Sequence, residues 1–160
     1  MTKSMTKFPT WYAIVLFACL SSFSLYAPTA TADPRNGTYL LTIKDATGEF
    51  ASRGVITLHG DHTLTAIDSA QGGPEFFFSS QQGAWEPDGE GGAVGRTLDF
   101  DFQLPQDVAR LDYVFDFRSD DKDVTGTITL TTFPLEGDPL HDEEGIVAGT
   151  FTFDGTRVRP

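Results

Sequence analysis

The residues with the clearest potential for chemistry form two short polar groups. His59-Gly60-Asp61-His62 brings nitrogen and oxygen ligands close together, but a metal site needs three or four converging ligands, and this sequence is typical of a solvated hairpin turn. The run 136–144 is acidic but lacks the spaced Asp pattern and bidentate closing residue of a calcium loop. No nucleophile-elbow, phosphate-loop or dinucleotide-binding motif occurs. The sequence therefore predicts no metal, no cofactor and no catalytic residue that can be named.

Aromatic residues form the other candidate site. Members of this set alternate along the chain and should gather on one side of neighbouring strands: Phe100, Phe102, Tyr113, Phe115, Phe117, Phe151 and Phe153. In a small barrel the inward face is either filled by side chains or lines a pocket. The set therefore predicts a packed core or an aromatic-walled cavity for one apolar molecule, because both need the same residues.

Phe76, Phe77 and Phe78 cannot all face inward, because side chains alternate along an extended chain. They lie in a predicted loop from Gln71 to Ser80, after Gly72-Gly73-Pro74. Apolar loop residues commonly mark a binding surface, so the sequence predicts a lid at the mouth of the pocket; a cap that touches no ligand is the alternative. Trp85 follows closely and is included in the predicted ligand-binding set.

These residues lie in strand-like runs separated by turn signals, without a convincing helical period. The predicted strands cover residues 37–44, 49–58, 63–69, 81–86, 98–104, 111–117, 124–133 and 146–158. Eight strands joined mainly by short links predict an all-β fold, an eight-stranded antiparallel up-and-down barrel. A two-sheet sandwich is the alternative, but it needs long crossovers, and the long links here are 71–80 and 134–145.

Strict alternation predicts which side chains point inward on two of these strands. The interior should hold Phe100, Phe102, Phe115 and Phe117. Water should surround Asp99, Asp101, Asp112 and Asp116. On the seventh strand Val124, Ile128 and Leu130 share one face, opposite the threonines between Thr125 and Thr131.

The first 32 residues differ in kind from the rest. Lys3 and Lys7 precede an apolar stretch, and Ala30-Thr31-Ala32 fits a signal-peptidase site. We predict a signal peptide over 1–32, a single domain over 33–160, and export to the periplasm or the extracellular medium. A membrane anchor is one alternative, although the apolar stretch is short for a span. Lipidation at Cys19 is another.

The net charge of the chain limits the classes of molecule that it is expected to bind. The chain has 23 acidic and 11 basic residues, a formal net charge of −12, and one Cys, which lies in the predicted signal peptide. Such a surface repels phosphate backbones and anionic lipids, so nucleic-acid binding and membrane insertion after signal cleavage are not expected. Thiol chemistry is excluded from the domain 33–160, and the oligomeric state is left open.

Several segments resemble the calycin superfamily, the lipocalin-like barrels, and more narrowly small secreted bacterial lipocalin-like proteins. They are residues 37–42, 54–63, 82–85, 124–127 and 149–158, all rich in Gly and Thr. The resemblance implies a closed barrel that binds a small hydrophobic molecule. In lipocalins a Gly-x-Trp opens the first strand, and a basic residue late in the barrel packs across that Trp. Here Tyr39 stands at the Trp position, and Arg157 could supply the cation.

The sequence thus predicts an exported barrel that binds a small hydrophobic ligand. One alternative is an isomerase or cyclase resembling allene-oxide-cyclase-type barrels, which works by positioning; its polar groups would come from Tyr39, Tyr113, Glu49 and Glu75. Another is a filled-barrel interaction module. A cavity without ionisable groups would favour carriage, a cavity with buried carboxyls or Tyr of shifted pKa would favour catalysis, and a filled interior would favour the module.

Overall fold

The computed structural model describes residues 32–71, 77–103, 105–118 and 122–160. The chain divides into two units, and the described residues all belong to the second, Ala32–Pro160. The strands are β1 (Gly37–Lys44), β2 (Phe50–Leu58), β3 (Thr63–Asp68), β4 (Gln81–Pro87), β5 (Ala93–Asp101), β6 (Asp107–Phe117), β7 (Asp123–Pro134) and β8 (Ile146–Arg157). No helix among these residues has the length and hydropathy needed to cross a membrane.

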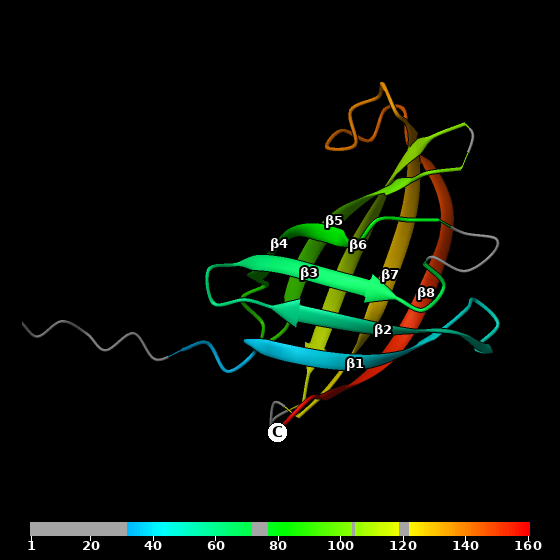
Figure 1. The fold of residues 1–160 in the computed structure, drawn as a ribbon. Coiled ribbons are helices and arrows are strands. Elements are labelled where there is room, and N and C mark those ends of the chain that lie inside the picture. The colour runs from blue at the N-terminus through cyan, green and yellow to red at the C-terminus, as the bar shows by residue number, and fades with distance from the viewer. Residues whose placement is uncertain (1–31, 72–76, 104, 119–121) are drawn as a thin grey trace, which may run out of the picture. The chain divides into compact units, whose positions relative to one another are not determined.

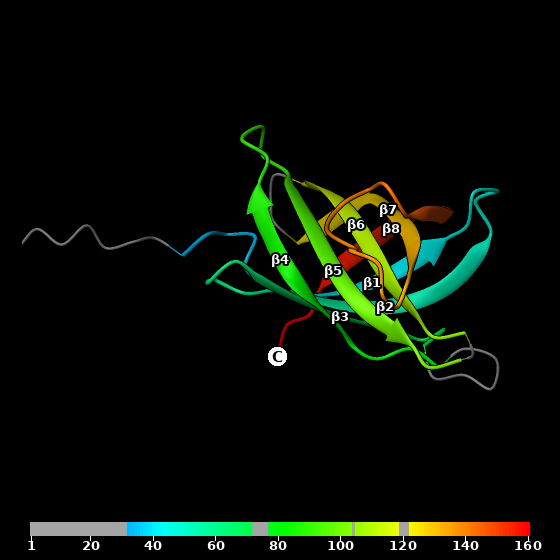
Figure 2. The ribbon, with the colours of Figure 1, turned by 90° about the horizontal axis from the view of Figure 1, so that it is seen from above.

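The eight strands form a closed antiparallel barrel in which the order in the sheet is the order in the sequence (Figure 1). Closure comes from β1, which pairs with β2 on one side and with β8 on the other, so that Tyr39 lies opposite Arg157 and Ile43 opposite Phe153. A view from above shows the strands surrounding a common interior (Figure 2). The predicted all-β, eight-stranded up-and-down barrel is confirmed, and the two-sheet sandwich is wrong.

The half of the interior near the β2–β3, β4–β5 and β6–β7 turns is filled; we call it the filled half. Tyr39, Leu64 and Phe115 are fully buried there. Phe115 stacks on Tyr113 at 5.5 Å between ring centres and meets Phe153 at 5.7 Å. Trp85 donates its indole N–H to the carbonyl of His59 at 2.9 Å. Aromatic side chains of the predicted set therefore close this end.

The inward face of β5 is the opposite of the prediction. Asp99 is buried at 3 % exposure, whereas Phe100 and Phe102 are 50 % and 55 % exposed on the outer wall. The reason lies earlier in β5, where Gly95 pairs with Tyr113. A Cβ on Gly95 would lie 2.8 Å from Leu64 Cδ2 and 3.2 Å from Phe115 Cε2. Glycine suits this tightly packed inward position, and alternation along the strand then places Asp99 inward and Phe100 outward.

The neighbouring strands follow the predicted pattern. On β6, Phe115 is buried and Phe117 half-buried, while Asp116 faces water and Asp112 is half-buried. On β7, Val124, Ile128 and Leu130 point inward and the threonines outward.

The β7–β8 link, predicted as a solvated acidic loop, also covers part of the outer wall. The Arg110 guanidinium lies 5.1 Å from the centre of the Phe133 ring and donates to the Pro139 carbonyl at 3.0 Å and to Asp142 at 2.6 Å. Phe133 and Val108 are consequently buried although they point away from the barrel interior. This small outer core fixes one wall of the other half of the barrel.

Candidate functional site

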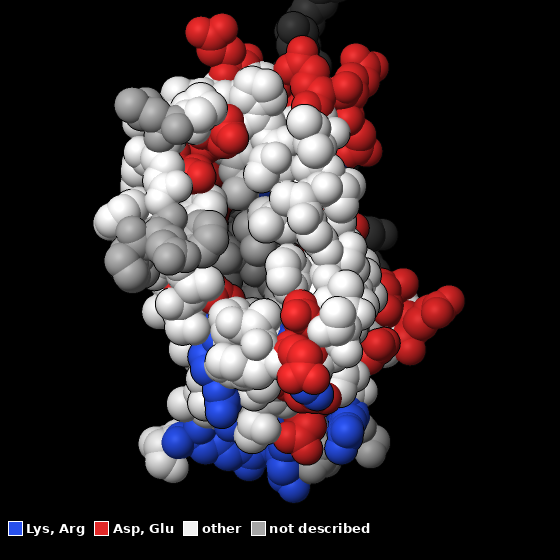
Figure 3. All heavy atoms as spheres, turned by 90° about the vertical axis from the view of Figure 1, so that its right-hand side faces the viewer, with Lys and Arg blue, Asp and Glu red and all other residues white. Residues whose placement is uncertain are grey.

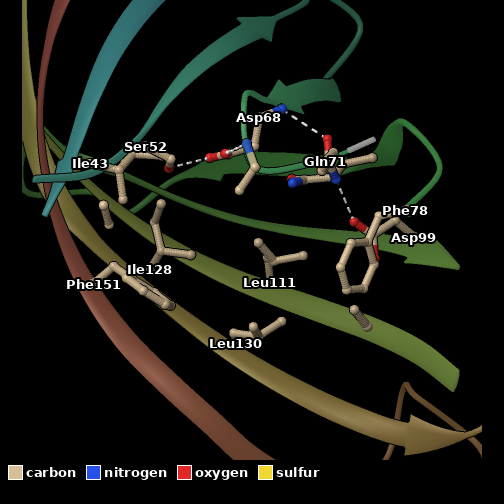
Figure 4. A pocket seen from close by; sticks show the side chains of 14 residues that line it. Ile43, Ser52, Asp68, Gln71, Phe78, Asp99, Leu111, Ile128, Leu130 and Phe151 are labelled. Carbon is tan, nitrogen blue, oxygen red and sulfur yellow. Dashed lines mark hydrogen bonds between the residues drawn. The ribbon is translucent and has the colours of Figure 1, made fainter. Parts of the chain in front are cut away.

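The half of the interior opposite the filled half contains a pocket of about 170 Å³, which we call the open half (Figure 4). It lies near the β1–β2, β3–β4 and β5–β6 links. Its large apolar side chains come from four strands and the link before β4: Ile43, Phe78, Leu111, Ile128, Leu130 and Phe151. Its polar side chains are Ser52, Asp68, Gln71, Gln81 and Asp99. Apolar walls with a few convergent polar groups are typical of small-molecule sites.

Asp99 is the most unusual group in the pocket. Its Oδ2 accepts a 2.7 Å hydrogen bond from the Gln71 amide, while its buried Oδ1 has no hydrogen-bond partner in the described part of the chain. Burial raises the pKa of Asp99 to about 7; the Gln71 hydrogen bond lowers the pKa and the nearby charge of Asp101 raises it. A carboxyl that changes charge near neutral pH, with one free oxygen, therefore lines the pocket.

Asp68 supplies a second carboxylate on the same side of the pocket. Its Oδ2 accepts a hydrogen bond from the Ser52 hydroxyl at 2.9 Å, and its Oδ1 accepts one from the Ala70 amide at 2.7 Å. The Asp68 amide donates to Gln71 Oε1 at 2.8 Å. Gln71 thus joins the Asp68 backbone amide at the end of β3 to the Asp99 carboxylate on β5 (Figure 4).

Gln81 sits at the floor of the pocket, beside the filled half. Its Oε1 accepts hydrogen bonds from the Tyr113 hydroxyl at 2.5 Å and from Thr97 at 3.1 Å. Burial raises the pKa of Tyr113, and its side-chain hydrogen bonds with Thr97 and Gln81 oppose that shift only in part. Tyr113 therefore stays protonated and acts as a hydrogen-bond donor to Gln81.

The pocket exists because small residues occupy inward-facing positions on the strands around it. Ala109 pairs with Asp99 across β5 and β6, and Gly149 pairs with Leu130 across β7 and β8. Because neither projects a large side chain inward, the open half is not filled as the other half is.

Acidic residues continue to the rim. Asp101 and Asp107 pair across β5 and β6, two residues beyond Asp99 and Ala109, and alternation places them on the same side of the sheet. No Lys, Arg or His of the described chain lines the pocket. Figure 3 shows acidic side chains at the upper end of the molecular face it presents, and Lys and Arg gathered at its lower end.

The predicted aromatic site residues divide between the two halves. Phe78 and Phe151 line the pocket. Most of the others belong to the filled half: Tyr39, Trp85, Phe115, Phe117 and Phe153. Tyr113 lies between the halves. Trp85 lies away from the pocket, because its ring stacks on His62 at 5.1 Å beside the β2–β3 turn.

Three predicted phenylalanines lie outside the barrel. Phe100 and Phe102 point outward on and just after β5, and Phe77 is 50 % exposed. The Phe102 amide donates to the Phe77 carbonyl at 2.9 Å, and Phe78 forms a β-bridge with Asp101. The end of the predicted lid therefore runs beside β5 with Phe78 turned into the pocket. Phe76 and Glu75 fall outside the described residues, and Glu49 is exposed.

Sequence reasoning missed the polar side of the pocket. Ser52, Asp68, Gln71, Gln81 and Asp99 look like ordinary strand-end or turn residues in the sequence. The signal that could have found Asp99 is the small-residue pattern Ala93, Gly95 and Thr97, which continues with the same parity to Asp99.

The His59–His62 segment forms the β2–β3 turn. Asp61 Oδ1 accepts hydrogen bonds from the amide and hydroxyl of Thr63 at 3.0 and 2.7 Å. His62 adopts a positive φ of 67° and stacks on Trp85. No group of three or more metal-ligating side chains occurs in the described ranges.

A second hollow, of about 550 Å³, lies over β4–β6. Exposed residues such as Val94, Val114 and Arg96 border it, and Arg96 bonds Asp112 across the strands at 2.5 Å. Its rim is solvated and its one cation, Arg96, is paired with Asp112, so the pocket in the open half is the better candidate.

No protein-family model, curated protein or solved structure matches this chain. Function is therefore inferred from the geometry of the pocket.

Proposed function

We propose that this protein binds a small, mainly apolar molecule in the pocket of the open half. The observation that carries the proposal is the contrast between two halves of one barrel: aromatic side chains fill one, while the other retains a 170 Å³ space with apolar walls and a buried carboxyl. Burying apolar ligand surface contributes about 25 cal/mol per Å² before the costs of ordering. The polar groups would then set the ligand's orientation.

The lipocalin-like resemblance and the predicted export support the same proposal. A secreted barrel with one closed end and one pocketed end suits the carriage of a single molecule. The Arg157 side chain over Tyr39 supports the resemblance, because its guanidinium carbon lies 5.8 Å from the ring centre. A filled-barrel interaction module has less support, since the open half holds a pocket.

Binding can be tested by filling the pocket. Leu130→Trp introduces a larger side chain from the pocket wall, and Leu40→Trp places the same side chain on the outer face, where Leu40 is 43 % exposed. We expect the unmodified protein and Leu40→Trp to bind 2-phenylethanol in isothermal titration calorimetry and Leu130→Trp to lose binding. Equal binding by all three proteins would place the ligand elsewhere, and no binding by the unmodified protein would count against carriage.

The pKa of Asp99 favours one second candidate function, acid–base isomerisation. In its acid form Asp99 would protonate one carbon of a substrate C=C bond, which leaves a carbocation on the other carbon of that bond. The carboxylate would then take a proton from the next carbon beyond the cation, so that the double bond moves by one position. This reaction predicts deuterium incorporation into a substrate during incubation in D₂O, measured by mass spectrometry of small-molecule extracts. Asp99→Asn should abolish the incorporation, and its persistence in the variant would exclude Asp99 as the proton donor.

A further inference from the structure

We propose that the ligand of this pocket is a small hydrophobic cation, of which a protonated amine beside an aromatic or branched apolar group is the simplest example. This inference rests on the proposed function and specifies the chemistry of the ligand. Four observations support it: the free oxygen of Asp99, the occupied hydrogen-bond donors of Ser52 and Gln71, the sign of the surrounding charges, and the apolar opposite wall.

The unpaired Oδ1 of Asp99 is the first observation. Asp99 is only 3 % exposed and lines the pocket. One of its carboxyl oxygens has no hydrogen-bond partner in the described part of the chain. A buried acceptor left unpaired is costly, and a ligand that donates to it removes that cost. A donor that also carries positive charge forms the stronger hydrogen bond.

The donors beside the two carboxylates are already in use. The Ser52 hydroxyl donates to Asp68, and the Gln71 amide donates to Asp99 and to the Ser79 carbonyl. On this side of the pocket a ligand carboxylate, phosphate or enolate would therefore meet carboxylate oxygens in place of hydrogen-bond donors. An anionic ligand is disfavoured by the same arrangement that leaves an acceptor free.

The groups facing Asp99 in the described chain have one sign of charge. They are Asp68 from β3, which lines the same pocket, Asp101 from β5 itself, and Tyr113 from β6, while Asp107 pairs with Asp101 at the rim. Tyr113 is neutral, and the others are carboxyls. A recess lined with one sign of charge concentrates counter-ions and raises their association rates, so the pocket and its rim attract a cation.

The apolar wall limits the cation to one with a hydrophobic body. Leu111, Ile128, Leu130 and Phe151 lie across the pocket from Asp99 and Gln71 (Figure 4). A bare metal ion would leave these side chains facing empty space, and a polyamine would place charge against them. An amine with a single apolar group can place its charge beside Asp99 and its apolar group against the opposite wall.

Three probes of similar shape separate the possibilities: 2-phenylethylamine, 2-phenylethanol and phenylacetate. By calorimetry at pH 8 we expect the amine to bind about ten-fold more tightly than the alcohol, as one charge-assisted hydrogen bond allows, and phenylacetate to bind most weakly. Asp99→Asn should lower amine affinity to the level of the alcohol. Asp116→Asn removes the same charge from an exposed outward position and should keep the preference.

Proton linkage gives an independent readout. Because the cation prefers the ionised carboxyl, amine affinity should fall as the pH is lowered from 8 to 6, and binding near pH 7 should release protons, detected as a dependence of the heat on buffer ionisation. Asp68→Asn, which removes the second carboxylate, should weaken the preference for the amine without abolishing alcohol binding. This variant tests the cation proposal if Asp99→Asn does not fold.

The outcomes distinguish the two proposals. If the alcohol binds and the amine has no advantage, or if the advantage survives in Asp99→Asn, the cation proposal is wrong and small-molecule binding stands. If none of the probes binds at any pH from 6 to 8, the proposed function fails and the cation proposal fails with it.

Discussion

The guanidinium carbon of Arg157 lies 5.8 Å from the centre of the Tyr39 ring, with the first and last strands of the barrel paired at these two residues. Arg157 also donates to the backbone carbonyls of Pro34 and Asn36, and the Tyr39 hydroxyl donates to the Arg35 carbonyl at 2.9 Å. One cation thus holds the segment before β1 against the end of β8.

Replacing Arg157 should therefore destabilise the barrel without altering ligand binding. Arg157→Met keeps much of the side-chain bulk but removes the charge and the hydrogen bonds. We expect a loss of about 1–3 kcal/mol in the free energy of unfolding, combining the cation–π contact with charged hydrogen bonds. Urea denaturation measures the loss, and Arg159→Met, at an exposed position, should change it little. Equal effects of the two substitutions would show that the contact adds no stability.

Two phenylalanines test the inward face of the barrel. Phe115→Ala should lower the free energy of unfolding by about 3–5 kcal/mol, because it empties a fully buried site. Phe102→Ala should lower it by less than about 1 kcal/mol, because that side chain is 55 % exposed. Chemical denaturation of both variants gives the comparison, and a large loss for Phe102→Ala would restore the inward orientation predicted from the sequence.

Ionisation of Asp99 should make the protein less stable at neutral pH than at acid pH. The pKa of Asp99 is raised from 3.8 to about 7 in the folded state, so between these values the folded state binds more protons than the unfolded one. Stability contributed by protonated Asp99 is therefore lost progressively as the pH rises from about 4 to 7.

Asp99→Asn removes this titration. We compare the free energy of unfolding of the variant with that of the unmodified protein at each pH. This difference should favour the variant by at least about 1 kcal/mol more at pH 8 than at pH 5, since each unit of pKa shift corresponds to about 1.4 kcal/mol. Differential scanning calorimetry at the two pH values measures the change. Asp116→Asn should follow the unmodified protein, and parallel curves for all three would mean that the Asp99 pKa is not raised.

Export can be tested at the N-terminus. Mass spectrometry of protein recovered from the periplasm or medium of an expressing bacterium should give a chain that starts at Asp33, because Ala30-Thr31-Ala32 fits the signal-peptidase site. An acylated Cys19 at the N-terminus would show a lipid-anchored protein, and an intact Met1 in the cytoplasm would exclude export.

The strands were predictable because turn residues and alternation act locally. The bounds of β1 agree with the prediction, and those of β2, β3 and β4 differ by one residue at one end. The direction in which β5 faces was not predictable from its own pattern, since Leu98, Phe100 and Phe102 do alternate with carboxylates. The side chains of Leu64 and Phe115, which are distant in sequence, pack closely around the inward position of Gly95 and so favour the observed orientation.

The site was predictable only in its apolar part. Phe78 and Phe151 line the pocket as predicted, because large apolar residues on strands tend to face the interior. The polar part depends on long-range pairs, such as Gln71 with Asp99 and Ser52 with Asp68. A carboxylate next to apolar residues is normally a sign of the solvated face, so only the closed barrel reveals that Asp99 is buried.

The pairing of β1 with β8 also governs how the barrel can form. Neighbours such as Leu40 and Thr156 are separated by most of the domain, so this ladder has a high loop-closure entropy and forms late compared with the seven hairpin pairings. Until β8 has been synthesised and released, β1 and β7 both present unpaired backbone edges. A chain that is exported while it is still being synthesised would cross the membrane before this last ladder can close, and the barrel would be completed on the far side of that membrane.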